Sequence, residues 1–230
     1  MRRFPLALSL AGLAAVALGL TACSAPTAAP ASVPTGDGPL VAFYGDSYTL
    51  GTGASAPDKR WSSVISAERG WREFNPSVNG LGFVNNRTTT GAGDLPDQII
   101  AQRPDIVFIT MGLNDNFSYD RAAGRIRQSI HDDVARLHEA LPEARFVVVE
   151  PFWYTGERPA SVDTIIGWVH EEADAIGADW IAGASHWLDG HYADDADSWM
   201  AADGLHPDDT GYAHMAERMD AALRALDPPL

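Results

Sequence analysis

The 230-residue chain contains a single cysteine, Cys23. One cysteine excludes an internal disulfide and a zinc site built from cysteines. Basic residues are also scarce, because 16 Lys and Arg stand against 31 Asp and Glu, for a formal net charge of −15. Such an acidic surface repels phosphate backbones, so we expect no nucleic-acid partner. Neither a recognised metal-ligand spacing nor a well-placed cofactor motif occurs, so the sequence predicts no metal and no cofactor.

The long apolar run of this chain lies at its start. Two arginines precede an apolar and small-residue run, Pro5–Leu20. Its length is near that of a signal-peptide core and short for a membrane span of about 20 residues. The run ends in LTAC, with Cys23 at the last position, which resembles the lipobox of bacterial lipoproteins. The resemblance implies a signal peptide over residues 1–22 and a lipidated Cys23. A plain secretory signal cleaved near the same place is the alternative.

The next segment reads SAPTAAPASVPTGDGP and has no apolar periodicity. Its richness in Pro, Ala, Ser and Thr predicts a flexible tether. We therefore expect a lipidated cysteine and tether over residues 23–38 and a single domain over residues 39–230, a length that supports one core. The protein would then lie outside the cell, held to a membrane only by its N-terminal lipid, or secreted in the alternative case.

Short apolar runs alternate with helical patterns throughout the domain. Five apolar runs predict buried strands, at residues 40–45, 71–78, 105–112, 144–151 and 179–183. They are continuous rather than alternating, which is typical of parallel strands covered on both faces. Helical patterns lie between and after them, at residues 60–69, 95–102, 120–141, 161–176 and 210–226. This order predicts a three-layer α/β/α domain with a central, mostly parallel five-stranded sheet.

A candidate site residue follows each of the first three predicted strands, and ligands of open parallel sheets bind at the carboxyl ends of the strands. Ser47 ends the GDS motif after the first strand, where an adjacent base would make its hydroxyl a nucleophile. The structural alternative is that Ser47 caps the following helix. Gly80 follows the second strand, and a glycine lets a backbone N–H approach a substrate oxygen closely. Asn114 follows the third, and its amide can hydrogen-bond a developing oxyanion.

Asp203 and His206 lie in the late segment DGLHP. An Asp three residues before a His can reach back to the imidazole Nδ1, fix the tautomer and leave Nε2 free as a base. Gly204 permits unusual backbone angles, and Pro207 stiffens the exit into the last helix. The structural alternative is a surface loop with a helix-capping acid.

Together the segments GDSYTLG, NGLGF, GLND and DGLHPDDTGY resemble the SGNH hydrolase superfamily, also called GDSL-like esterases and lipases. The resemblance spans nearly the whole domain and implies a flavodoxin-like fold. It implies that Ser47 is the nucleophile of a carboxylic ester hydrolase. His206 would be the general base and then the acid, and Asp203 would orient His206.

The resemblance also implies an oxyanion hole. Its donors would be the Ser47 N–H, the Gly80 N–H and the Asn114 side chain, with Gly82 as a rival to Gly80. The Asp of GDS, Asp46, is not the triad acid in this interpretation. The site predicts an extracellular serine esterase that forms an acyl-enzyme and hydrolyses small acyl esters.

The expected substrate is a small ester or an acylated glycan, such as an acetyl group on a carbohydrate or cell-wall polymer. The sequence has no long apolar lid segment, which argues against long-chain triglycerides. Trp153 and Tyr154 follow the fourth strand and are expected to line the site. An acyltransferase or thioesterase-like enzyme with the same site and a non-catalytic surface-binding lipoprotein are the alternatives.

Overall fold

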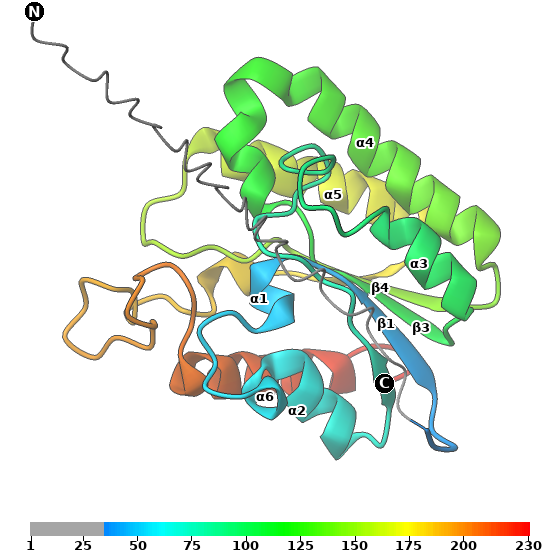
Figure 1. Cartoon of the computed structure of the whole chain (residues 1–230), viewed down its shortest axis with the longest axis horizontal. Coiled ribbons are helices and arrows are strands. Elements are labelled where there is room, and N and C mark those ends of the chain that lie inside the picture. Colours follow the sequence, from blue (N-terminus) through cyan, green and yellow to red (C-terminus); the bar gives the residue numbers. More distant parts are fainter. Residues whose placement is uncertain (1–34) are drawn as a thin grey trace, which may run out of the picture.

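The computed structural model describes residues 35–230, so the predicted signal peptide and Cys23 lie outside the described residues. A central sheet lies between two layers of helices (Figure 1). Its strands run in the order β2-β1-β3-β4-β5 and every neighbouring pair is parallel. This arrangement confirms the predicted α/β fold. The strands are β1 (Leu40–Tyr44), β2 (Arg72–Phe74), β3 (Ile106–Ile109), β4 (Arg145–Val149) and β5 (Asp179–Ile181).

Helices cover both faces of the sheet, as Figure 1 shows. One layer holds α3 (Leu95–Gln102), α4 (Tyr119–Ala140) and α5 (Ala160–Ile176), and the other holds α2 (Trp61–Glu68) and α6 (Asp209–Arg224). Each coincides with a predicted helix to within two residues at either end. Shorter pieces are α1 (Ser47–Leu50) and three 3₁₀ turns, η1 (Pro57–Lys59), η2 (Leu113–Ser118) and η3 (Ala184–His186). In residues 35–230, no helix has the length and apolar character needed to cross a bilayer.

Successive side chains of β1 enter two different cores. Val41 and Phe43 pack beneath α2 and α6, whereas Ala42 and Tyr44 pack beneath α3, α4 and α5. Side chains of a strand alternate between the faces of a sheet, and here both faces are covered. Every position of the strand is therefore buried, which explains its continuous apolar run.

Strand β2 is shorter than the predicted 71–78. Asn75 ends it, because its Oδ1 accepts the Ser77 N–H at 3.1 Å and its Nδ2 donates to the Thr49 carbonyl at 2.8 Å. Such an Asn turn competes with the ladder, and Pro76 has no N–H to give to it. The chain leaves the sheet here, and residues 75–94 form the loop that carries Gly80.

Candidate active site

Ser47 is the first residue of α1, three residues beyond the end of β1. Asp46 is the helix cap, since its side chain accepts the Tyr48 N–H at 3.0 Å, so the interpretation of Ser47 as the cap is wrong. Gly45 permits this turn, because a Cβ there would lie 2.5 Å from the Thr49 Cβ and 2.6 Å from the Thr110 Oγ1. Ser47 is consequently placed at the carboxyl end of β1.

A pocket of about 220 Å³ opens beside Ser47. It brings together Ser47, Gly80, Asn114 and His206, which come from four segments far apart in the chain. Most of its exposed wall is apolar. Its lining consists of Ser47, Tyr48, Asn79, Gly80, Leu113, Asn114, Phe117, Leu205 and His206. Four of the predicted site residues thus meet at one edge of the sheet.

Asp203 lies behind His206 and holds its ring. The Asp203 Oδ2 is 2.7 Å from the His206 Nδ1, and the Asp203 Oδ1 accepts the backbone N–H groups of Leu205 at 2.9 Å and His206 at 3.0 Å. Partial burial raises the pKa of Asp203, but the hydrogen bonds from His206 and from the backbone outweigh it and lower that pKa to about 2. A charged carboxylate therefore faces Nδ1 and leaves Nε2 available as a base.

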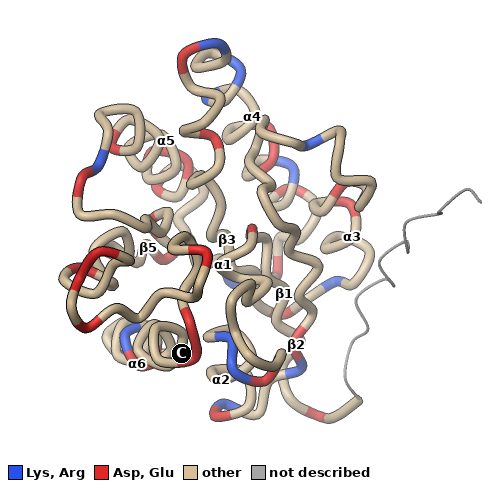
Figure 2. Tube along the Cα trace, turned by 60° about the vertical axis from the view of Figure 1, so that its left-hand side comes forward, with Lys and Arg blue, Asp and Glu red and all other residues tan. Residues whose placement is uncertain are grey.

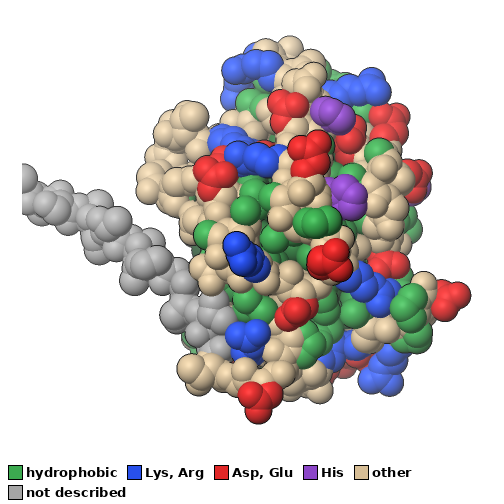
Figure 3. Space-filling model, turned by 90° about the vertical axis from the view of Figure 1, so that its right-hand side faces the viewer, with side chains coloured by type: hydrophobic (Ala, Val, Ile, Leu, Met, Phe, Trp, Pro, Cys, Tyr) green, Lys and Arg blue, Asp and Glu red, His purple; other side chains and the backbone are tan. Residues whose placement is uncertain are grey.

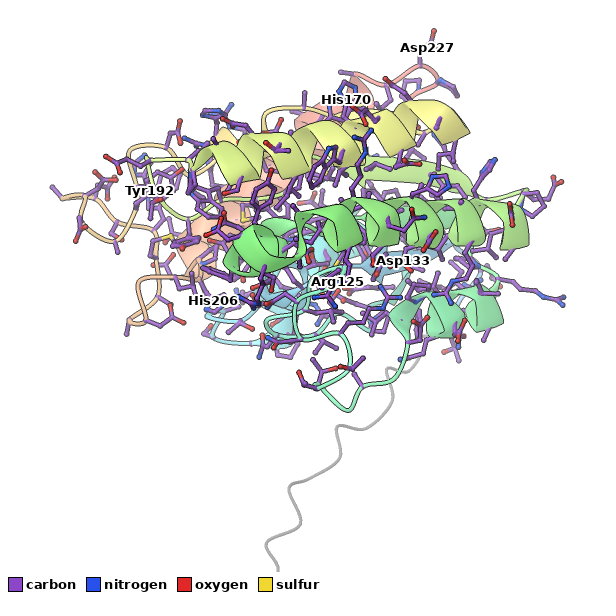
Figure 4. The ribbon with its side chains drawn as sticks, turned by 90° about the horizontal axis from the view of Figure 1, so that it is seen from above. Arg125, Asp133, His170, Tyr192, His206 and Asp227 are labelled. Carbon is purple, nitrogen blue, oxygen red and sulfur yellow. The ribbon has the colours of Figure 1, made fainter. Side chains whose placement is uncertain are left out.

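His206 itself is 13% exposed and borders the pocket (Figure 4). In this view it lies toward the end of the molecule at which α4 begins, and Asp227 lies at the opposite end. Within the described part of the chain, no hydrogen bond joins the Ser47 Oγ to the His206 ring. Hydrogen bonds between a nucleophile and its base commonly tighten only when substrate binds.

Tyr48 ties the serine to the histidine loop. Its hydroxyl donates to the Leu205 carbonyl at 2.8 Å, and its ring centroid is 6.0 Å from that of His206. Gly53 also packs on this loop, because a Cβ there would lie 2.4 Å from the Pro207 carbonyl oxygen. The residue after Ser47 thus bonds the residue before His206, across 157 positions of sequence.

Two residues of the pocket lining have a backbone N–H without a hydrogen-bond partner in the described residues. Within residues 35–230, neither the Ser47 N–H nor the Gly80 N–H has a backbone or side-chain acceptor. The Asn114 amide differs, since its Nδ2 donates to the Asp46 Oδ2 and to the Leu81 carbonyl, each at 3.1 Å. Both N–H groups of the Asn114 amide thus have acceptors already, so a substrate oxygen would have to share one of them with Asp46 or Leu81. The role of Asn114 as a third oxyanion donor stays a prediction.

Gly80 and Gly82 have different surroundings. Gly80 lines the pocket and has a positive φ of 70°, a conformation that favours glycine. Gly82 lies away from the pocket lining, against Asp115, where a Cβ would come within 2.6 Å of the carboxylate. The pocket geometry therefore favours Gly80 over Gly82 as the source of a backbone donor.

Asp46 is buried directly behind the serine turn. Burial, together with the nearby charge of Asp115, raises the pKa of Asp46 to about 7, against the lowering effect of hydrogen bonds from Tyr48 N–H and the Asn114 amide. Its carboxyl contacts the backbone of α1 and Asn114 rather than the His206 ring. This placement agrees with the interpretation that Asp46 is not the acid that orients the histidine.

Sequence reasoning missed the apolar wall of the pocket. Phe117 is 47% exposed and is the one large hydrophobic side chain of residues 35–230 that is exposed. The signal was present, because Phe117 and Leu205 are apolar residues in otherwise polar segments beside Asn114 and His206. The expectation for Trp153 and Tyr154 is wrong, since neither lines the pocket. Trp153 instead donates its Nε1–H to the Glu157 carbonyl at 2.8 Å.

The acidic segment before α6 forms its own network of contacts. Asp189 accepts hydrogen bonds from Arg158 at 2.5 Å and from the Tyr192 hydroxyl at 2.6 Å, and it lies 2.8 Å from the His186 Nδ1. Figure 2 shows acidic stretches of the trace in the region of β5 and α6. Among the described residues, no three His, Cys, Asp or Glu side chains cluster closely enough to hold a metal.

Comparison with known proteins shows the family to which this chain belongs. The model of the GDSL-like lipase/acylhydrolase family matches residues 43–214. The GDSL lipase Rv0518 of Mycobacterium tuberculosis is 28% identical over 188 residues, which cover 78% of this chain and 79% of that protein.

Two solved structures show the same fold at low sequence identity. The psychrotrophic esterase EstA from Pseudoalteromonas sp. has a TM-score of 0.61 at 16% identity, over 80% of this chain and 96% of that one. A family two carbohydrate esterase from Cellvibrio japonicus has a TM-score of 0.63 at 18% identity, over 83% of this chain and 62% of that one. Both similarities concern the fold.

Proposed function

Because this chain belongs to the GDSL-like lipase/acylhydrolase family and is a hydrolase of ester bonds, we propose that it is an extracellular serine esterase for small acyl esters. Ser47 is its nucleophile, His206 its general base and acid, and Asp203 the residue that orients the histidine. One observation carries the proposal. Ser47, Gly80 and the Asp203-bound His206 line one pocket, and the backbone N–H groups of Ser47 and Gly80 have no acceptor in residues 35–230.

The reaction follows from these positions. The Ser47 Oγ attacks the ester carbonyl while the His206 Nε2 takes its proton, which gives a tetrahedral oxyanion. The N–H groups of Ser47 and Gly80 stabilise that charge, and Asp203 stabilises the imidazolium. His206 then protonates the leaving alcohol, so that the C–O bond breaks and an acyl-enzyme remains. Water, deprotonated by His206, attacks the acyl carbon and releases the acid and the free serine.

The pocket supports a small substrate. Its volume of about 220 Å³ is in keeping with a short acyl group. Leu113, Phe117 and Leu205 offer apolar side chains to a substrate, and Asn79 adds a polar one. The fold shared with a carbohydrate esterase is in keeping with an acylated glycan as the natural ester.

Replacement of the serine tests the proposal. Wild-type protein is expected to hydrolyse acetyl and butyryl nitrophenyl esters and acetylated glycans, and to react covalently with a fluorophosphonate probe. Ser47→Ala is expected to lower kcat by several orders of magnitude and to abolish labelling, because members of a catalytic triad act as a unit. Unchanged hydrolysis by folded Ser47→Ala protein would rule out Ser47 as the nucleophile. A folded wild-type protein that neither reacts with the probe nor cleaves these esters would contradict the proposed activity.

A further inference from the structure

Asp115 is buried beside the pocket without lining it. Its carboxylate accepts three backbone hydrogen bonds from the loop that follows β2. The Oδ2 accepts the Phe83 N–H at 2.7 Å, and the Oδ1 accepts the N–H groups of Val84 at 2.8 Å and Asn85 at 3.1 Å. These contacts cross about thirty positions of sequence and join η2 to the loop that carries Gly80.

Asn85 continues this connection to Gly80. Its side-chain Nδ2 donates to the Gly80 carbonyl at 3.0 Å, while its Oδ1 accepts the Ser118 hydroxyl at 2.7 Å. The Asn85 backbone is thus held by Asp115 and its side chain by Ser118, both from η2. A continuous set of hydrogen bonds therefore runs from the Asp115 carboxylate to the carbonyl of Gly80, a residue of the pocket lining.

Asp115 of η2 packs closely against the backbone of the loop that follows β2. Gly82 has no room for a side chain, because a Cβ would lie 2.6 Å from all three atoms of the carboxylate group. Burial raises the pKa of Asp115, although the backbone hydrogen bonds from Val84, Asn85 and Phe83 act against this effect. A carboxylate so deeply buried costs folding free energy unless its hydrogen bonds repay it. An apolar residue in this space would leave the backbone N–H groups of Phe83, Val84 and Asn85 without their acceptor, so the carboxylate holds this loop in place.

We propose that Asp115 is a positioning residue for ester hydrolysis, which holds Asn85 and through it the Gly80 carbonyl, and so fixes the backbone of the residue whose N–H stabilises the substrate oxyanion. The proposal rests on the proposed serine esterase function. Under this proposal η2 has two roles. It carries Asn114, the predicted oxyanion donor, and through Asp115 it holds the loop that carries Gly80. Asp115 acts through Asn85 and Gly80 and does not touch the substrate.

Asp115→Asn tests this role with little change in volume. The amide has one acceptor oxygen instead of two, so at least one of the three backbone bonds is lost. We expect kcat to fall about 10- to 100-fold, less than the factor of about 10²–10³ for outright loss of an oxyanion donor. KM should stay within about twofold, because ground-state binding does not depend on this N–H.

Asn85→Ala tests the next link without disturbing the buried carboxylate. It removes the side-chain bond to the Gly80 carbonyl, and Asn86 keeps a second bond to that oxygen at 3.1 Å. We expect a fall in kcat of about 2- to 10-fold, the equivalent of one hydrogen bond, again at constant KM. This variant decides the question if Asp115→Asn does not fold.

Glu150→Gln is the matched control. Its carboxylate also braces a loop, accepting the N–H groups of Gly183 at 2.8 Å and Ser185 at 3.1 Å, but that loop contributes no residue to the pocket. We expect it to lower the melting temperature and to leave kcat within about twofold. If Asp115→Asn and Asn85→Ala fold and lose only thermal stability, with kcat unchanged, Asp115 is merely structural and the proposal fails. Absence of hydrolysis by the wild type would instead contradict the proposed function.

Discussion

Asp46, beside the catalytic serine proposed here, is a carboxyl group that the fold removes from water. Its pKa is raised from 3.8 to about 7, mainly by burial. Asp203, which contacts His206, has its pKa lowered to about 2 by hydrogen bonds. The pKa values of these two aspartates are therefore shifted in opposite directions. Asp203 stays charged and can orient an imidazole, and Asp46 holds its proton up to neutral pH while it caps α1.

The raised pKa of Asp46 predicts a pH dependence of stability. Between about pH 4 and pH 7 the unfolded chain has released this proton and the folded protein retains it, so the free energy of unfolding falls as the pH rises through that window. Asp46→Asn cannot ionise. We expect its stability relative to wild type to increase by up to a few kcal/mol from pH 4 to pH 7 and to level off above. Urea denaturation across this range measures the difference, and parallel curves for the two proteins would contradict the assignment.

At the scale of elements, the site depends on how α1 is joined to the loop before α6. The Tyr48 hydroxyl bonds Leu205, and the Tyr212 hydroxyl of α6 donates to the Thr52 carbonyl at 2.7 Å. Ser55 adds two bonds to Asp209 at the start of α6, from its N–H at 2.8 Å and from its hydroxyl at 2.6 Å. These contacts fix the histidine loop against the serine turn.

Tyr48→Phe tests the join nearest to the chemistry. The ring remains packed, but the Leu205 carbonyl loses its donor and the His206 loop is less constrained. We expect a loss of about 1 kcal/mol of stability and a fall in kcat of several-fold, measured by urea denaturation and ester hydrolysis. Tyr44→Phe is the control, since its hydroxyl bonds Asp133 at 2.6 Å on the other face of the sheet. Equal effects of both variants on kcat would show that the join has no special role.

At the scale of the whole molecule, the described surface is charged and mixed. The face in Figure 3 shows acidic and basic side chains side by side, with hydrophobic side chains in small areas between them. Net charge is strongly negative, so the domain itself offers little attraction to an anionic bilayer. If the protein is held at a membrane, as we propose, the attachment depends on the N-terminal segment and on Cys23.

Cys23→Ala tests that attachment in the full chain. In a bacterium that processes lipoproteins, we expect wild-type protein in the membrane fraction and the variant in the soluble or secreted fraction, because a lipid on Cys23 is the proposed anchor. Ser47→Ala should fractionate as wild type and so serves as the control. Membrane association that survives Cys23→Ala would show that the lipobox interpretation is wrong.

The sequence by itself determined the strands, the helices and the residues at the strand ends. Burial on both faces of the sheet requires continuous apolar runs, which can be recognised locally in the sequence. Asp203 and His206 lie three residues apart in one loop, so their pairing is also a local signal. It did not reveal the shortness of β2, because Asn75 ends that strand through contacts with residues far away in the chain.

Only the tertiary structure decided which of these residues share a pocket and which support it. Ser47 and His206 come together through the parallel order of the sheet and the contact of Tyr48 with Leu205. Asp115 is, in the sequence, only the neighbour of Asn114. In the structure its carboxylate accepts hydrogen bonds from backbone N–H groups about thirty residues away. Local patterns specify where a chain bends and what it buries, whereas burial of a carboxylate and the groups that compensate it depend on segments that meet only after folding.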